Sequence, residues 1–193
     1  MDSITVILGQ PEQVPPVKEL LKFTQSTQRV QDMMRTELRH RNLWQDTMFP
    51  GLHLSPILGE LLALAIPHVD SSETGDVLEV FRISAILYIS ALRARFGIDT
   101  LSAVPHYVEK LYACLFSSSS ELPPSLLIWA LSIAFTSHRH PDRTNWFGQV
   151  LRARSLSMGI TNYEGLLTIL AETVWDDELL PLQSQSLQSI FVL

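Results

Sequence analysis

Residues 76–96 most constrain what this chain can fold into. Apolar side chains spread there around most of a helix circumference and are interrupted mainly by arginines. They are Val77, Val80, Phe81, Ile83, Ile86, Leu87, Ile89 and Leu92. A helix that is apolar on nearly all sides must be surrounded by other elements. The segment therefore predicts a central helix, and with it a core built from several helices.

The arginines of this segment predict one polar line along the central helix. Arg82 and Arg93 are close to three full turns apart and emerge along nearly the same line, whereas Arg95 lies off it. Glu79 precedes Arg82 by one turn, so we expect an ion pair between them. The alternative is a basic stripe that faces a ligand.

Helical periodicity continues along the rest of the sequence. We expect further helices over 15–37, 55–66, 106–116, 124–138, 145–158 and 164–175. Residues 57–66 are apolar on nearly every face, which predicts a buried short helix. Alternation of apolar and polar residues is missing, so no sheet is expected. The fold class is all-α, a single irregular multi-helix domain of about six to eight helices, with residues 1–50 as an amphipathic helical arm and 51–193 as the domain proper.

Capping signals bound several of these helices. A Ser, Thr or Asp followed three residues later by Glu is typical of a helix start, and a Gly after the last turn is typical of an end. The start pairs are Asp76 with Glu79 and Thr161 with Glu164, and the closing glycines are Gly97 and Gly159.

Charge and cysteine usage exclude several function classes. The net charge is −6 and the pI is about 5.4, so a nucleic acid or an anionic membrane repels the chain on average. Apolar runs fall short of the roughly 20 residues of a membrane-spanning helix. One cysteine, no Asn-x-Ser/Thr site and a start without a basic segment indicate a protein that is not secreted. We expect it in the nucleus or the cytoplasm, with no membrane contact.

Two polar clusters raise the question of a metal site. His138, His140 and Asp142 lie close together but lack helical spacing and a fourth ligand, so we interpret them as a solvated loop rather than a metal site. The run 175–178, Trp-Asp-Asp-Glu, offers paired carboxylates for a divalent cation. A second acidic motif is missing, so solvated acids at a helix end are the favoured interpretation.

Candidate catalytic residues are equally few. Cys114 lies among apolar residues, and His106 is eight positions away, so we expect a packed thiol rather than a nucleophile. Nucleophile-elbow, dinucleotide-binding, P-loop and HExxH motifs are missing. Four aromatic residues are expected in the core, with the lining of a pocket for a hydrophobic small molecule as the alternative: Trp129, Trp146, Phe147 and Trp175. We assign no catalytic, cofactor-binding or metal residue and expect no cofactor.

Four spaced segments carry a resemblance to a known family. They are an arginine-led helix ending in Arg-Ala-Arg-Phe-Gly-Ile (82–98), a Leu-Ile-Trp-Ala-Leu segment (127–131), the pair Trp146-Phe147, and 170–177 with its Trp and Asp. Together they resemble the C-terminal regulatory domain of fungal-specific transcription factors of the zinc binuclear cluster class. The resemblance spans residues 52–180 and implies an all-α regulatory domain.

The chain departs from that family in its DNA-binding part. Full-length members bind DNA through six cysteines that hold two zinc ions, whereas this chain contains Cys114 alone. We therefore expect no direct contact with nucleic acid. The resemblance implies a regulator tied to a secondary-metabolite gene cluster, which acts through protein partners such as a full-length transcription factor or a second copy of itself. The alternative is a helical enzyme or small-molecule-binding protein of a biosynthetic pathway.

Overall fold

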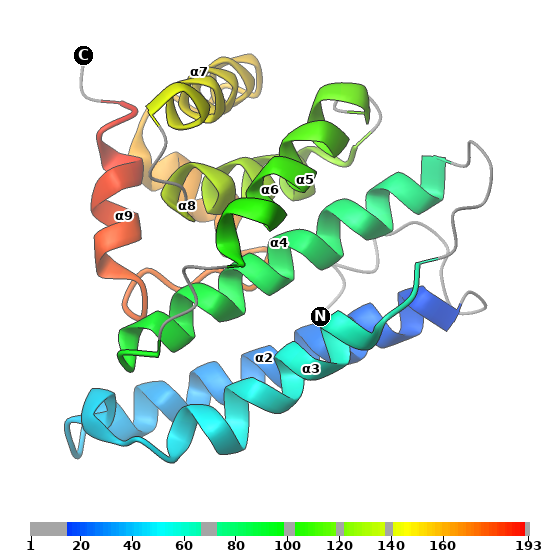
Figure 1. The fold of residues 1–193 in the computed structure, drawn as a ribbon. Coiled ribbons are helices and arrows are strands. Elements are labelled where there is room, and N and C mark those ends of the chain that lie inside the picture. The colour runs from blue at the N-terminus through cyan, green and yellow to red at the C-terminus, as the bar shows by residue number, and fades with distance from the viewer. Residues whose placement is uncertain (1–14, 67–72, 99–102, 119–121, 138–140, 192–193) are drawn as a thin grey trace.

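The computed structural model describes residues 15–66, 73–98, 103–118, 122–137 and 141–191 (Figure 1). In these ranges the chain forms eight α-helices and no strand, which confirms the all-α prediction. The helices are α2 (Pro15–Leu38), α3 (Ser55–Ala63), α4 (Glu73–Arg95), α5 (Val104–Ser118), α6 (Pro124–Ser137), α7 (Pro141–Ser157), α8 (Tyr163–Leu170) and α9 (Pro181–Gln188). A 3₁₀ turn, η1 (Leu43–Gln45), and a π-helical turn, η2 (Pro50–Leu54), connect α2 to α3. None of these helices combines the length and apolarity needed to cross a bilayer.

The helices form an outer pair, a central helix and an upper group. α2 and α3 run antiparallel and side by side at the bottom of Figure 1, and both contact α4. α4 crosses the middle of the molecule, and α5 to α9 lie on its other side. Within the upper group, α6 packs against α4, α5, α7, α8 and α9.

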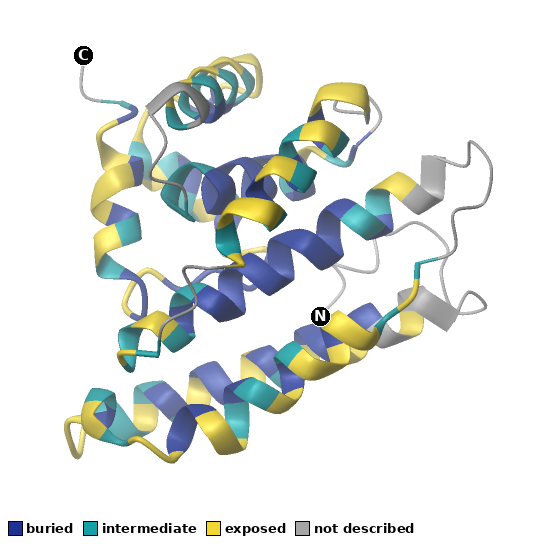
Figure 2. Cartoon of the chain, in the orientation of Figure 1, coloured by how far each residue is buried: buried dark blue, intermediate teal, exposed yellow. Residues whose placement is uncertain are grey.

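The central position of α4 confirms the prediction from its apolar circumference. Residues 80–90 are all buried, and the helix is dark blue along most of its length in Figure 2. Its buried hydroxyl group at Ser84 donates a hydrogen bond of 2.8 Å to the Val80 carbonyl. Because the helix satisfies this side chain itself, a serine costs little in such a core.

Two of the predicted helix ends are confirmed in detail. Gly97 follows α4 with φ of 74°, and the amide of Ile98 donates to the Arg93 carbonyl. Gly159 follows α7 with φ of 76°, and Ile160 donates to Ser155 in the same way. Both ends are Schellman motifs, in which glycine accepts the left-handed conformation without a Cβ clash.

Both predicted start pairs are wrong. α4 begins at Glu73, so Asp76 lies inside the helix and cannot cap it. The cap of α8 is Asn162, one residue after Thr161; its side chain accepts a hydrogen bond of 2.8 Å from the Gly165 amide. Asx and hydroxyl side chains compete for the same capping role, so the cap position shifts easily by one residue.

Helix boundaries differ from the expected ones in the C-terminal part. α7 begins at Pro141 instead of the predicted Asn145. Proline suits the first turn of a helix. α8 ends at Leu170, whereas the predicted helix extended to Trp175. Residues 171–180 consist mainly of turns. The sequence analysis placed no helix at Pro181–Gln188, where α9 lies.

The prediction that residues 57–66 form a buried helix is wrong for one side of α3. Ile57 and Leu61 are buried, whereas the Leu62 side is open, with 49% of that residue exposed. α3 belongs to the outer pair, so only its inner side meets other elements.

Candidate interaction surface

The outward side of α3 is an exposed apolar surface. We define the α3 face as Leu52, Pro56, Gly59, Leu62 and Ala63, all of which are exposed. Leu52 is 62% exposed, and a Cβ atom added at Gly59 would meet no atom within 4 Å. The spacing of three and four residues places Pro56, Gly59, Leu62 and Ala63 along one side of α3, and Leu52 lies in the turn η2 directly before it. The α3 face is therefore a line of exposed apolar residues.

Aromatic stacking supports the beginning of this surface. Phe49, directly before η2, stacks on Phe96 at the end of α4 with ring centroids 5.5 Å apart. Trp44 contacts Phe96 from η1 at 5.1 Å, and the Arg95 guanidinium lies 4.4 Å from the centroid of the Trp44 ring. Such a cation over an indole face is stabilising. Arg95 thus has a structural role at the base of α3.

An ion-pair cluster fixes the other end of α3. Arg82 donates two hydrogen bonds of 2.7 Å to the Glu79 carboxylate, which confirms the predicted pair, and a third of 3.2 Å to the Leu61 carbonyl. Lys110 of α5 also contacts Glu79, at 2.5 Å. The last turn of a helix leaves carbonyl groups without a helical partner, and Arg82 satisfies one of them.

The electrostatics of this cluster favour the ionised carboxylate. Burial raises the pKa of Glu79, but the hydrogen bonds from Arg82 and Lys110 outweigh burial and bring the pKa below its ordinary value. Arg82 is 9% exposed and lies between α3, α4 and α5, so it does not offer a cation to a ligand. The alternative of a ligand-facing basic stripe therefore fails at Arg82.

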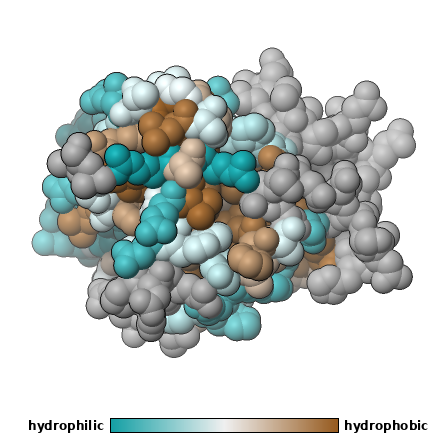
Figure 3. Space-filling view, turned by 90° about the horizontal axis from the view of Figure 1, so that it is seen from above, coloured by the Kyte–Doolittle hydropathy of each residue, from teal (hydrophilic) through white to brown (hydrophobic). Residues whose placement is uncertain are grey.

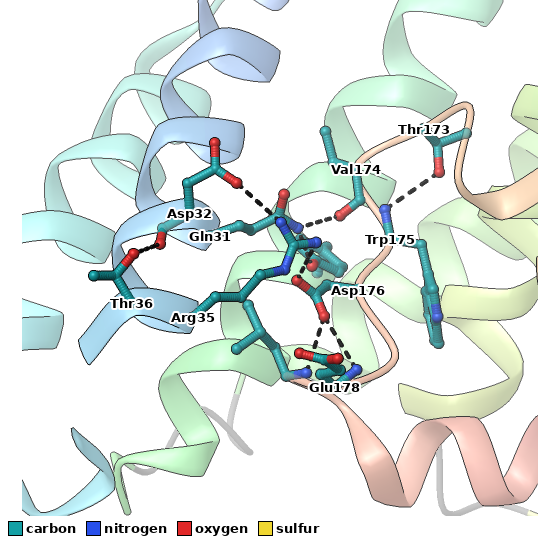
Figure 4. Close-up of polar contacts among 11 residues, drawn as sticks. Gln31, Asp32, Arg35, Thr36, Thr173, Val174, Trp175, Asp176 and Glu178 are labelled. Carbon is teal, nitrogen blue, oxygen red and sulfur yellow. Dashed lines mark hydrogen bonds and ion pairs between the residues drawn. The ribbon is translucent and has the colours of Figure 1, made fainter. Parts of the chain in front are cut away.

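A buried polar network attaches α2 to the C-terminal part of the chain (Figure 4). The Gln31 amide donates hydrogen bonds of 2.6 Å to the Tyr88 hydroxyl and 2.5 Å to the Val174 carbonyl. Arg35, one turn later, forms an ion pair of 2.7 Å with Asp176. These contacts cross the boundary at residue 50 between the predicted arm and domain.

Asp176 corrects the interpretation of the acidic run as solvated. Only 1% of its side chain is exposed, and its Oδ1 accepts hydrogen bonds of 3.1 Å from the Glu178 and Leu179 amides. Burial raises its pKa, against the lowering effects of these amides and of Arg35. Asp177 and Glu178 are exposed, as expected. Because Asp176 caps a turn and pairs with an arginine, it serves the fold rather than a cation.

A basic line runs along the outward side of α2. We define it as Lys18, Lys22 and Arg29, which are exposed and separated by four and seven residues. Lys22 Nζ lies 3.9 Å from the carboxylate of Glu60, the neighbour of Gly59 in α3. The basic line therefore borders the α3 face.

A concave feature lies between α6, α7 and the end of α9. It has a volume of about 280 Å³ and mixes polar with apolar side chains. Its lining is Phe135, Thr144, Asn145, Gly148, Gln149, Arg152, Ser189 and Ile190. Figure 3 views the molecule from above, where hydrophobic residues are interspersed with hydrophilic ones.

The four aromatic residues of the sequence analysis do not line this cavity. Trp129 and Phe147 are fully buried, Trp175 is 7% exposed, and Trp146 packs edge-on against Tyr112 with centroids 4.7 Å apart. They belong to the core or to its margin, in agreement with the favoured interpretation.

The other candidate residues bring no chemistry together. Cys114 is half-buried, and burial raises the pKa of its thiol, which disfavours the reactive thiolate. His106 is exposed. His138, His140 and the side chain of Asp142 lie outside the described residues, and the described residues contain no cluster of three or more metal-ligating side chains.

Neither the α3 face nor the basic line was predicted from the sequence. A signal was present, because Glu60 is the one charged residue between Thr47 and Ile66, so this segment has too few polar groups to cover its own outer side. Comparison of the chain with protein-family models, with curated proteins and with solved structures finds no match. The resemblance to fungal transcription factors stays a prediction.

Proposed function

We propose that this protein is a regulatory interaction protein that acts by binding another protein through the α3 face. The observation that carries the proposal is the exposure of Leu52 and Leu62 on one continuous side of a helix held at both ends. Single exposed hydrophobic residues are common, but a contiguous apolar surface is typical of an interaction site.

The rigidity of α3 supports this role. Its last turn is tied to Arg82, and its approach is packed through Phe49 on Phe96. A preformed surface loses less conformational entropy on binding than a mobile one. The surface is therefore suited to recognition without a large rearrangement.

The resemblance supplies the cellular context of the proposal. The resemblance implies a regulator similar to fungal-specific transcription factors, which is tied to a secondary-metabolite gene cluster and located in the nucleus or the cytoplasm. DNA would be reached through a bound partner, since the net charge of −6 opposes direct phosphate contact. The resemblance implies a full-length transcription factor as such a partner.

A strain that lacks the gene tests the proposal. It would be complemented with wild-type protein, with Leu52→Ser/Leu62→Ser, or with the control Leu182→Ser, whose leucine is 63% exposed on α9. We expect the double variant to lose most of the effect on transcripts of adjacent genes at equal protein level, and the control to retain it. Full activity of the double variant would show that the α3 face is not the functional surface.

A small-molecule-binding function is the second candidate. The cavity between α6, α7 and α9 favours it, because Arg152 and several amide and hydroxyl side chains line it together with Phe135. The same strains separate the two candidates, since a function that rests on this cavity does not require Leu52 or Leu62.

A further inference from the structure

Positive charge is concentrated in α2 and the turn that follows it. Residues 15–41 contain six basic and three acidic residues, a net charge of 6 − 3 = +3. The whole chain has −6, so the remaining residues carry −6 − 3 = −9. The basic line of Lys18, Lys22 and Arg29 is the exposed part of this basic segment that borders the α3 face. A partner on that face therefore meets apolar side chains and cations together.

The geometry fits one helix. From Leu52 to Ala63 the α3 face is about 17 Å long at 1.5 Å per residue. A partner helix of three to four turns would cover it, with its apolar stripe on Leu52, Gly59 and Leu62. Gly59 permits close approach of a second helix axis because nothing projects from it. Such helix-on-helix docking is a recurrent mode of peptide recognition.

We propose that the occupant of the α3 face is an amphipathic helix of a partner protein whose apolar stripe is edged by carboxylates, which pair with Lys18, Lys22 and Arg29. This inference rests on the proposed function and names its partner class. The apolar stripe supplies affinity, and the carboxylates set orientation and speed association with the basic line.

Two other occupants fit the charges less well. A second copy on a symmetric interface would bring the two basic lines near each other, and like charges across an interface are unfavourable. An anionic membrane would meet the whole chain with its net charge of −6, and α3 is fixed between Phe96 and Arg82, so it cannot insert independently.

The test measures binding of a labelled synthetic helix of 18 residues by fluorescence anisotropy, with the full chain. The probe has a leucine stripe edged by glutamates, and a second probe has lysines in place of the glutamates. We expect the glutamate probe to bind at least about tenfold more tightly than the lysine probe, with an affinity that falls as salt rises. Equal binding of the two probes, or no binding of the glutamate probe, would overturn the inference.

Protein variants locate the interaction. We expect Lys22→Glu/Arg29→Glu to weaken binding of the glutamate probe by about tenfold and to strengthen binding of the lysine probe. Leu62→Glu should weaken both probes. The control Arg39→Glu/Arg154→Glu, at positions outside the basic line, changes the net charge equally and should leave the preference for the glutamate probe intact. Circular dichroism would confirm that each variant folds.

The other occupants are outcomes of the same design. A dimer in analytical ultracentrifugation that is lost in Leu62→Glu would identify a second copy and overturn the inference. Binding to phosphatidylserine vesicles that is lost in the same variant would identify a membrane and overturn it as well.

The strain experiment distinguishes an error in the partner class from an error in the proposed function. If Lys22→Glu/Arg29→Glu retains regulation while Leu52→Ser/Leu62→Ser loses it, the carboxylate-edged partner is wrong and the proposed function stands. If both variants retain regulation, the proposed function fails.

Discussion

α3 and α6 have a similarly apolar sequence but differ in burial. In α6, residues 126–134 are all buried, as its apolar circumference predicts. In α3, Ile57 and Leu61 are buried and the opposite side is exposed. The difference lies in their neighbours, because five helices surround α6 whereas α3 packs chiefly against α2, α4 and η2. Among the described residues, the burial of an apolar helix thus depends on how many other helices surround it.

Truncation of one large side chain in each helix should give the largest difference in stability between variants of α6 and α3. Trp129→Ala in α6 should lower the free energy of unfolding by about 3–5 kcal/mol, because it leaves a large cavity in the core. Leu62→Ala in α3 should change it by no more than about 0.5 kcal/mol. Chemical denaturation followed by circular dichroism measures both. A comparable loss in the two variants would show that the outer side of α3 is covered.

Replacement of Arg82, which donates to the last turn of α3, should destabilise α3 more than α6. Arg82→Met leaves Glu79 with Lys110 alone and frees the Leu61 carbonyl, at a cost of about 2–3 kcal/mol. Hydrogen exchange should increase in α3 and remain slow in α6. Faster exchange in both helices alike would mean that Arg82 supports the whole core rather than α3.

The same variant has a characteristic pH dependence. The pKa of Glu79 is lowered in the folded protein, so its stabilising effect is present above the ordinary value of 4.5 and is lost as pH falls through the folded pKa. Arg82→Met should therefore lose less stability than the wild type between neutral and acidic pH. An equal loss of stability in acid in the variant and in the wild type would show that Glu79 is not the source of that loss.

Asp176 should give the smallest effect and the opposite pH dependence. Its pKa is raised by burial, so the stability it contributes is greatest below the ordinary value of 3.8 and declines as pH rises through the folded pKa. Asp176→Asn keeps an oxygen for the Glu178 and Leu179 amides and should remove this decline, with a loss of about 1–2 kcal/mol at neutral pH because the charged contact with Arg35 is lost. Thermal melting across pH measures it. A decline that persists in the variant would assign it to another group.

Local chemistry made much of the fold predictable. The apolar circumference of α4 and α6, the pair of Glu79 with Arg82, and the glycines at 97 and 159 all depend on residues near each other in sequence. Periodicity and left-handed helix ends are short-range properties, so they can be derived before any packing is known. The capping pair at Thr161 failed because the neighbouring Asn162 caps α8, and the pair at Asp76 failed because α4 begins three residues earlier, at Glu73.

The candidate site depended on long-range contacts. Composition and periodicity alone indicate that the chain is all helical, acidic and too apolar in α3 for a fully solvated helix. The packing of the whole chain places α3 in the outer pair, brings Lys22 to its border, and turns Asp176 inward to Arg35. Arg35 and Asp176 are far apart in the chain. Pattern analysis reports which sides of a helix are apolar, whereas burial depends on which other helices arrive there, and that is settled by how the whole chain packs.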